Sequence, residues 1–136
     1  MEITKKYLRN LVQVVKEASE KVHNIFGPDF YEQAYLESMI HELAARNINY
    51  RVNVEVPIKF KGDVLNSTLT CDLVIENLLA VEIKVVEDIT PIHISEILTY
   101  MAMLELPIGL FLNFDCSNIK RIGQKTFTNE FYKNFS

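Results

Sequence analysis

The stretch from Leu78 to Val86 constrains the fold most, because it is apolar at nearly every position except Glu82 and Lys84. A strand that is apolar on both faces is expected in the middle of a sheet that is covered on both sides. Glu82 and Lys84 are two residues apart, so they project from the same face of that strand. A carboxylate and an ammonium in such surroundings are costly unless they pair or bind something. The sequence therefore predicts a central strand that carries a polar pair.

The remaining elements follow from periodicity and from turn residues. Apolar residues at three- and four-residue steps predict helices at Thr4–Phe26 and Phe30–Arg46, separated by Gly27-Pro28-Asp29. Thr90 and Pro91 open a third helix, which is predicted to continue to about Glu105. Strands are predicted at Val52–Phe60, Leu65–Glu76, Leu78–Val86 and Pro107–Phe114, with a short fifth at Ile119–Ile122 and a weakly periodic tail from Thr126.

The order of these elements predicts an α/β fold of α+β-like character, with a mixed sheet and helices packed on it. In the first strand, the residues Val52, Val54, Val56, Ile58 and Phe60 are predicted to share one half-buried face. Pro57 places this strand at an edge of the sheet or makes its end irregular. A chain of 136 residues predicts a single domain over residues 1–136.

Composition narrows the function classes. The 49% hydrophobic and 24% charged residues are globular values, and two cysteines without a CxxC pair predict no zinc site. The polar N-terminus and the lack of a long apolar run predict no signal peptide, no membrane partner and a cytoplasmic location. The net charge of −4 argues against a generic nucleic-acid binder. The last part of the chain is nevertheless basic, through Lys120, Arg121, Lys125 and Lys133.

Asp72 adds a second carboxylate to the polar pair of the central strand. It lies on the preceding strand, and counting back from a turn at Glu76-Asn77 places it next to Glu82 within about one residue of register. Two adjacent carboxylates repel each other, and a divalent cation such as Mg²⁺ would relieve that repulsion. A lysine beside such an ion could position or deprotonate water and stabilise charge on a phosphate. The alternative is a structural Glu–Lys pair without a ligand.

Two helices carry polar stripes that could face this cluster. In the second helix, one sector of about 100° contains Glu32, Tyr35, Met39, Glu42 and Leu43. Carboxylates on a core-facing stripe indicate a nearby site. Alternatively, Glu32 lies near the start of the helix, where a negative charge interacts favourably with the helix dipole, and Glu42 lies at the border of the core-facing sector. The third helix repeats the pattern with His93, Glu96 and Tyr100, which is informative only if this stripe faces the cluster.

Several short motifs, in order, resemble one known family over about residues 8 to 123. They are Gly27-Pro28, Glu32-Gln33-Ala34-Tyr35, Glu42-Leu43, Thr70-Cys71-Asp72-Leu73, Val81 to Glu87, Thr90 to His93, Leu98 to Tyr100 and Gly109 to Phe114. Together these motifs resemble the GxxExxY proteins, a branch of the PD-(D/E)XK nuclease superfamily. The resemblance implies a restriction-endonuclease-like core of helix, three strands, helix and strand, with an extra N-terminal helix.

The resemblance also implies roles for particular residues. Its metal, Mg²⁺ or Mn²⁺, would be held by Asp72, Glu82, Ile83 and Glu32, and Tyr35 would support Glu32. The implied catalytic set is Asp72, Glu82, Lys84, Glu32, Glu96 and Tyr100. Glu96 and Tyr100 match a QxxxY element with glutamate in place of glutamine, which adds a negative charge. Asp29 replaces the glycine of GxxExxY.

Three hypotheses follow for the function. The first is a magnesium-dependent nuclease that hydrolyses phosphodiester bonds of DNA or RNA. The second is a weakly active or inactive nuclease-fold module that binds nucleic acid or protein, with Lys120, Arg121 and Lys125 carrying the binding. The third is a small accessory subunit or homodimer, in which a partner extends the substrate groove.

Overall fold

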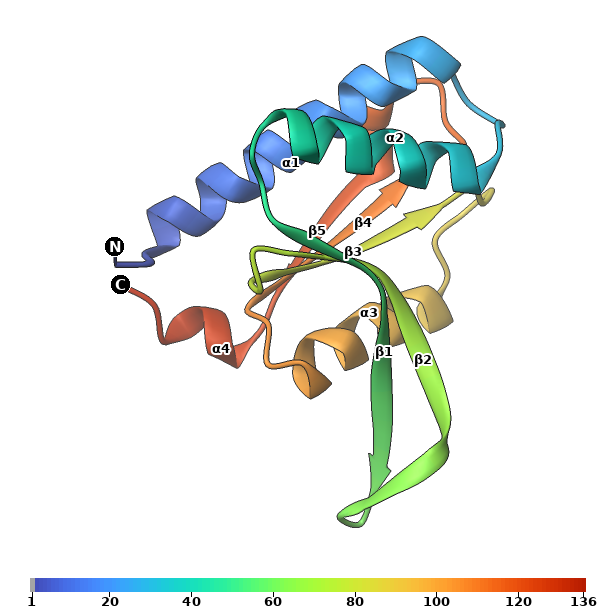
Figure 1. Cartoon of the computed structure of the whole chain (residues 1–136). Coiled ribbons are helices and arrows are strands. Elements are labelled where there is room, and N and C mark those ends of the chain that lie inside the picture. The colour runs from blue at the N-terminus through green and yellow to red at the C-terminus, as the bar shows by residue number, and fades with distance from the viewer. Residues whose placement is uncertain (1) are drawn as a thin grey trace.

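The structure is a computed structural model, and it describes residues 2–136 (Figure 1). Helices α1 and α2 precede three strands, and α3 lies between β3 and β4. The elements are α1 (Lys5–Phe26), α2 (Glu32–Ala45), β1 (Tyr50–Phe60), β2 (Asp63–Ile75), β3 (Leu79–Lys84), α3 (Pro91–Met103), β4 (Ile108–Asn113), a π-helical turn (Ile119–Gly123), β5 (Gln124–Thr128) and α4 (Glu130–Lys133). The predicted α/β class with a mixed sheet is confirmed.

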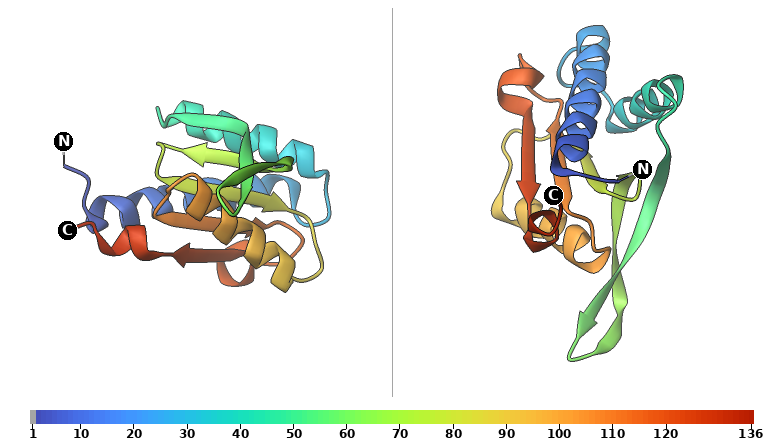
Figure 2. Two further views of the ribbon diagram at one scale, coloured as in Figure 1. Left: turned by 90° about the horizontal axis from the view of Figure 1, so that it is seen from below. Right: turned by 90° about the vertical axis from the view of Figure 1, so that its left-hand side faces the viewer.

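The five strands form one sheet in the order β1-β2-β3-β4-β5. β3 and β4 are parallel, and the other neighbours are antiparallel. Helices α1 and α2 cover one face of the sheet and α3 covers the other (Figure 2). β3 is therefore central and buried on both sides up to Lys84, which is half-buried. This confirms the interpretation of the Leu78–Val86 stretch.

Capping residues fix where the helices begin. The Thr4 side chain accepts a hydrogen bond from the Tyr7 amide, 3.1 Å away, at the start of α1. Thr90 caps α3, and Pro91 is its first residue, as the sequence predicts. α1 buries only one stripe of its surface, from Leu8 to His23. Within residues 2–136, no helix combines the length and the apolar character that crossing a membrane requires.

The fifth strand predicted at Ile119–Ile122 is wrong. These residues form the π-helical turn, in which the Asn118 side chain accepts a hydrogen bond from the Arg121 amide at 3.1 Å. Ile119 is buried while Ile122 is 65% exposed, and their three-residue spacing suits a helical turn better than a strand. The edge strand β5 follows immediately and includes Thr126–Thr128, the start of the segment predicted as a weakly periodic tail.

The hairpin of β1 and β2 bends where it leaves the sheet. The ladder pairs Val52 with Leu73 and Val54 with Cys71, but it skips the pair between them. Asn53, on the β1 side of this gap, has a φ of 50°, a value that asparagine tolerates better than most residues. The rest of the hairpin extends away from the sheet as an arm (Figure 1).

This bend corrects the prediction for the first strand. Val56 is buried, but Val52 is 37% exposed and Phe60, near the tip of the arm, is 59% exposed. The expected continuous apolar face is therefore interrupted, because the bend at Asn53 changes which side chains meet the core. β1 is nevertheless an edge strand with a register shift between Pro57 and Lys59, as Pro57 predicts.

Candidate active site

The candidate site lies where β2 and β3 separate. Their regular ladder ends at the pair Leu73 and Val81. Beyond it, the Asp72 amide donates a hydrogen bond to Glu82 Oε1 at 3.0 Å. The Ile83 amide donates to Asp72 Oδ2 at 2.8 Å. Two carboxylates thus replace the main-chain acceptors that would continue the ladder, and Asp72 lies opposite Glu82 as the hairpin count predicts.

These carboxylates are poorly solvated. Glu82 is only 3% exposed, and burial, followed by the negative charge of Asp72, raises the pKa of Glu82 to about 8. Burial also raises the pKa of Asp72, against the opposing effects of the Ile83 amide and the Lys84 ammonium. Two ionised carboxylates in this gap are therefore unfavourable, and either a proton or a cation must compensate them.

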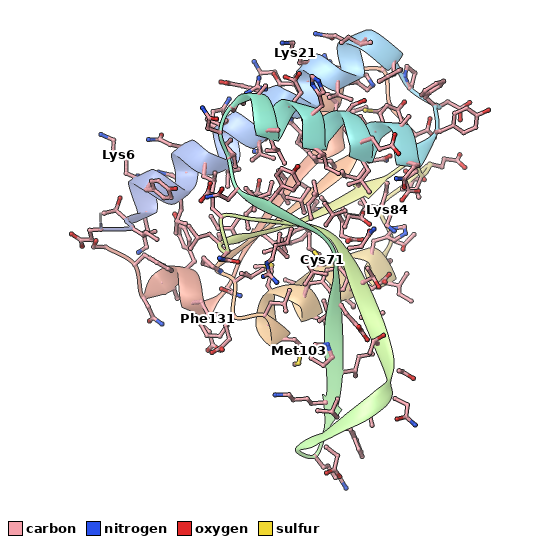
Figure 3. All side chains as sticks on the ribbon, in the orientation of Figure 1. Lys6, Lys21, Cys71, Lys84, Met103 and Phe131 are labelled. Atoms are coloured by element: carbon pink, nitrogen blue, oxygen red, sulfur yellow. The ribbon has the colours of Figure 1, made fainter. Side chains whose placement is uncertain are left out.

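Lys84 supplies a positive charge next to the two carboxylates. Its Nζ lies 3.6 Å from Glu82 Oε2 and 3.9 Å from Glu32 Oε1. Partial burial lowers the pKa of Lys84, but Glu82, Asp72 and further carboxylates outweigh this effect and raise it. The side chain is therefore a charged ammonium. In the view of Figure 3, Lys84 lies between α2 and α3.

Helix α2 contributes Glu32, its first residue. Partial burial raises the pKa of Glu32, and the nearby Lys84 counteracts this. A cavity of about 280 Å³ connects Glu32 to the gap between the strands. Its lining residues are Glu32, Gln33, Leu36, Asn53, Asp72 and Ile83. The cavity thus joins residues of α2, β1, β2 and β3.

Comparison with known proteins agrees with this geometry. The family model described as the PD-(D/E)XK nuclease superfamily matches residues 9–125. The chain belongs to the PD-(D/E)XK nuclease superfamily. Searches of curated proteins and of solved structures gave no match. In this PD-(D/E)XK chain, Glu82-Ile83-Lys84 matches the (D/E)XK part of the motif, and Cys71-Asp72 stands at the position of its Pro-Asp part.

In this PD-(D/E)XK fold, Tyr35 fixes the loop that leads to Glu32. Its hydroxyl donates a hydrogen bond to the Gly27 carbonyl and accepts one from the Phe30 amide at 3.1 Å. Its ring stacks on Phe114 with a centroid distance of 4.2 Å. Tyr35 therefore holds the start of α2, and with it Glu32, against the sheet.

The Tyr35→Phe variant tests this positioning role. Loss of the hydroxyl leaves the Gly27 carbonyl and the Phe30 amide without their partner, so we expect a loss of about 1–3 kcal/mol in the free energy of unfolding. Urea denaturation measures this, with Tyr50→Phe as a control at a tyrosine outside the loop. Equal stability of Tyr35→Phe and the unmodified chain would contradict the role.

Glu42 does not join the cluster. It pairs with Arg46 at 2.5 Å and with Lys21 at 3.7 Å, and the Arg46 hydrogen bond lowers its pKa despite partial burial. The stripe interpretation thus fails for Glu42, which lies at the border of the buried face. The reason is local, because an arginine four residues later on the same helix face offers a partner.

The three residues of the predicted stripe on α3, His93, Glu96 and Tyr100, have two different roles. The Tyr100 hydroxyl lies 3.5 Å from Glu96 Oε2, and the negative charge of Glu96 helps to raise the pKa values of Glu82 and Lys84, after larger effects. Burial and then Glu82 raise the pKa of Tyr100. These two residues face the cluster. His93 instead completes the cap of α3, with its Nδ1 3.1 Å from the Thr90 amide.

The oxygen donors of the gap suit a hard divalent cation. Among residues 2–136, no group of three or more His, Cys, Asp or Glu side chains stands ready to hold a metal. Glu82 and Asp72 each use one oxygen to accept a strand amide, which leaves a second oxygen on each. The Ile83 amide points into the gap. The Ile83 carbonyl points to the same side, because the N–H and C=O groups of one strand residue face the same neighbouring strand. Two carboxylates and one carbonyl, completed by water, are ligands that Mg²⁺ accepts.

Gln33 and Leu36 line this cavity without being predicted site residues, and so does Asn53. Its signal was weak: an asparagine within an alternating strand is a residue that tolerates positive φ and can therefore mark a bend. The bend places Asn53 across from Asp72 in the same cavity.

Proposed function

We propose that this chain is a magnesium-dependent nuclease that hydrolyses phosphodiester bonds in DNA or RNA. The observation that carries the proposal is the pair Asp72 and Glu82, hydrogen-bonded across the split between β2 and β3 with Lys84 Nζ beside it. Membership of a nuclease superfamily supports the reaction class. A salt bridge with a merely structural role would not require a second buried carboxylate, since Lys84 already balances one.

In the proposed mechanism, Asp72, Glu82 and the Ile83 carbonyl would hold the ion, with Glu32 on the opposite wall of the cavity. When bound, such an ion lowers the pKa of water and neutralises charge on the phosphate. The Lys84 ammonium orients the attacking water and donates hydrogen bonds to the phosphate oxygens on which charge develops. Glu32, 3.9 Å from Lys84 Nζ, holds the ammonium toward the cavity.

We also propose that the chain belongs to the GxxExxY branch of the superfamily. The support is local: Glu32 lines the cavity, and Tyr35 binds the carbonyl of Gly27 in the loop before α2. The glutamate and the tyrosine of that motif therefore act together at the start of α2, although Asp29 stands at its glycine position. Glu96 in place of glutamine leaves an extra carboxylate near Glu82. We propose that it tightens the binding of the ion rather than coordinating the substrate.

A cleavage assay tests the proposed function. Purified protein is incubated with supercoiled plasmid, single-stranded DNA or RNA, in Mg²⁺, Mn²⁺ or EDTA. We expect cleavage of at least one substrate with Mg²⁺ or Mn²⁺ and none in EDTA. Cleavage that persists in EDTA would contradict the metal dependence. Absence of both cleavage and heat in a calorimetric Mn²⁺ titration would contradict the proposal as a whole.

A further inference from the structure

An exposed group of aromatic rings lies in and beside the loop between α1 and α2. This aromatic patch consists of Phe26, Phe30 and Tyr31, whose exposed fractions are 38%, 40% and 74%. Phe26 and Phe30 are stacked, with centroids 4.9 Å apart and planes at 9°. Tyr31 meets Phe30 edge-on at 5.0 Å. Large aromatic side chains gathered on a surface usually mark a binding site, and nothing in the proposed mechanism uses them.

The aromatic patch is continuous with the candidate active site. Tyr31 directly precedes Glu32, whose carboxylate lies 3.9 Å from Lys84 Nζ. The loop lies at the same end of the molecule as the C-terminal end of β3 (Figures 1 and 2). A polymer whose backbone enters the gap between β2 and β3 would therefore pass the aromatic patch within one or a few units.

The rings are held on a fixed backbone. The Tyr35 hydroxyl binds both ends of the loop, through the Gly27 carbonyl and the Phe30 amide. Phe26 and Phe30 also meet the Tyr35 ring edge-on, with centroid distances of 6.1 and 6.3 Å. A platform that is already ordered loses little conformational entropy when a flat ligand stacks on it.

Charge indicates how a substrate would gain affinity here. The net charge of −4 and the carboxylates of the site give phosphate little attraction. Stacking of bases on aromatic side chains tolerates any sequence and is worth about 1–3 kcal/mol per base. Beyond the aromatic patch, a groove of about 260 Å³ between α1 and α2 contains Lys21, but this lysine is paired with Glu42 at 3.7 Å. The groove therefore adds little attraction for phosphate.

We propose that the aromatic patch binds unpaired nucleobases next to the scissile phosphate. The substrate class is then single-stranded nucleic acid or an unpaired segment of a duplex, because bases inside a duplex are covered by their neighbours on both faces. Tyr31 is the outermost ring and makes the first stacking contact, while Phe30 supports it from the side. This inference rests on the proposed nuclease function for the choice of ligand.

Binding without turnover tests the inference. All variants carry Lys84→Ala to prevent cleavage, and the anisotropy of fluorescein-labelled oligothymidylate and of a matched duplex is measured in Mg²⁺. Tyr31→Ala removes the ring, Tyr31→Phe retains it, and Phe60→Ala removes an exposed ring from the tip of the arm as the control. We expect Tyr31→Ala to weaken binding of the single strand roughly 5- to 100-fold. Tyr31→Phe and Phe60→Ala should leave it unchanged.

Two outcomes would overturn the inference. One is equal single-strand affinity of Tyr31→Ala and its parent. The other is loss of a dimer in sedimentation of Tyr31→Ala, which would make the aromatic patch an interface between copies of the chain. The proposed nuclease function is judged separately by the cleavage assay of the unmodified chain, so failure of the inference leaves it standing, and absence of cleavage leaves the binding result standing.

Discussion

Replacing Lys84 with alanine should reduce the rate of metal-dependent cleavage by about 10²–10⁴-fold while leaving the fold intact, a magnitude typical of a positioned catalytic group. The reason is the location of its Nζ, 3.6 Å from Glu82 Oε2 and 3.9 Å from Glu32 Oε1. Removal of the ammonium takes away the donor for water and phosphate but neither carboxylate. Single-turnover cleavage at saturating Mn²⁺ measures the loss.

Comparison of Asp72→Ala with Lys84→Ala separates ion binding from chemistry. Asp72→Ala removes a proposed ligand, so we expect both the heat of Mn²⁺ binding and cleavage to disappear. Lys84→Ala should lose cleavage but keep the heat of Mn²⁺ binding. Lys21→Ala is the matched control, since Lys21 pairs with Glu42 on α2 rather than with the site. Thermal melts establish that each variant is folded. Cleavage by Lys84→Ala at the rate of the Lys21→Ala control would refute the catalytic role of Lys84.

The sheet and the polar pair were predictable because both depend on short, regular periods. Alternation with period two puts Glu82 and Lys84 on one face whatever the tertiary structure is. The count from the hairpin turn to Asp72 requires only that the two strands pair without a bulge, and their ladder is regular as far as Leu73 and Val81. The sequence therefore contained the register of the site.

Features that depend on competition between contacts were not predictable. Helical geometry puts Glu42 on the same stripe as Glu32, but the nearby guanidinium of Arg46 decides its environment. The bend at Asn53 depends on both strands at once, and only one of them carries a residue suited to it. The turn at Ile119 resembles a strand until the capping bond of Asn118 is known. In each case the local sequence pattern is compatible with two structures, and a contact with another residue determines which of them forms.

In EDTA, the Glu82→Gln variant should be more stable than the unmodified chain at pH 8.5 and equally stable at pH 5. Burial, then the charge of Asp72, raises the pKa of Glu82 from 4.5 to about 8 in the folded protein. Between those pH values the folded chain keeps a proton that the unfolded chain releases, so stability falls as the pH rises. We expect Glu82 to account for about 2–4 kcal/mol of this loss.

Glutamine isolates this effect because it has the same shape and can still accept the hydrogen bond from the Asp72 amide, but it cannot ionise. Thermal unfolding between pH 5 and pH 8.5 should therefore show a melting temperature that falls about 10 °C more in the unmodified chain than in Glu82→Gln. Adding Mn²⁺ at pH 8.5 should reverse the order, because the ion replaces the lost proton only where both carboxylates are present. Parallel pH profiles of the two proteins in EDTA would show that Glu82 is solvated and ionised without an ion, and the electrostatic reason for a cation between β2 and β3 would then be lost.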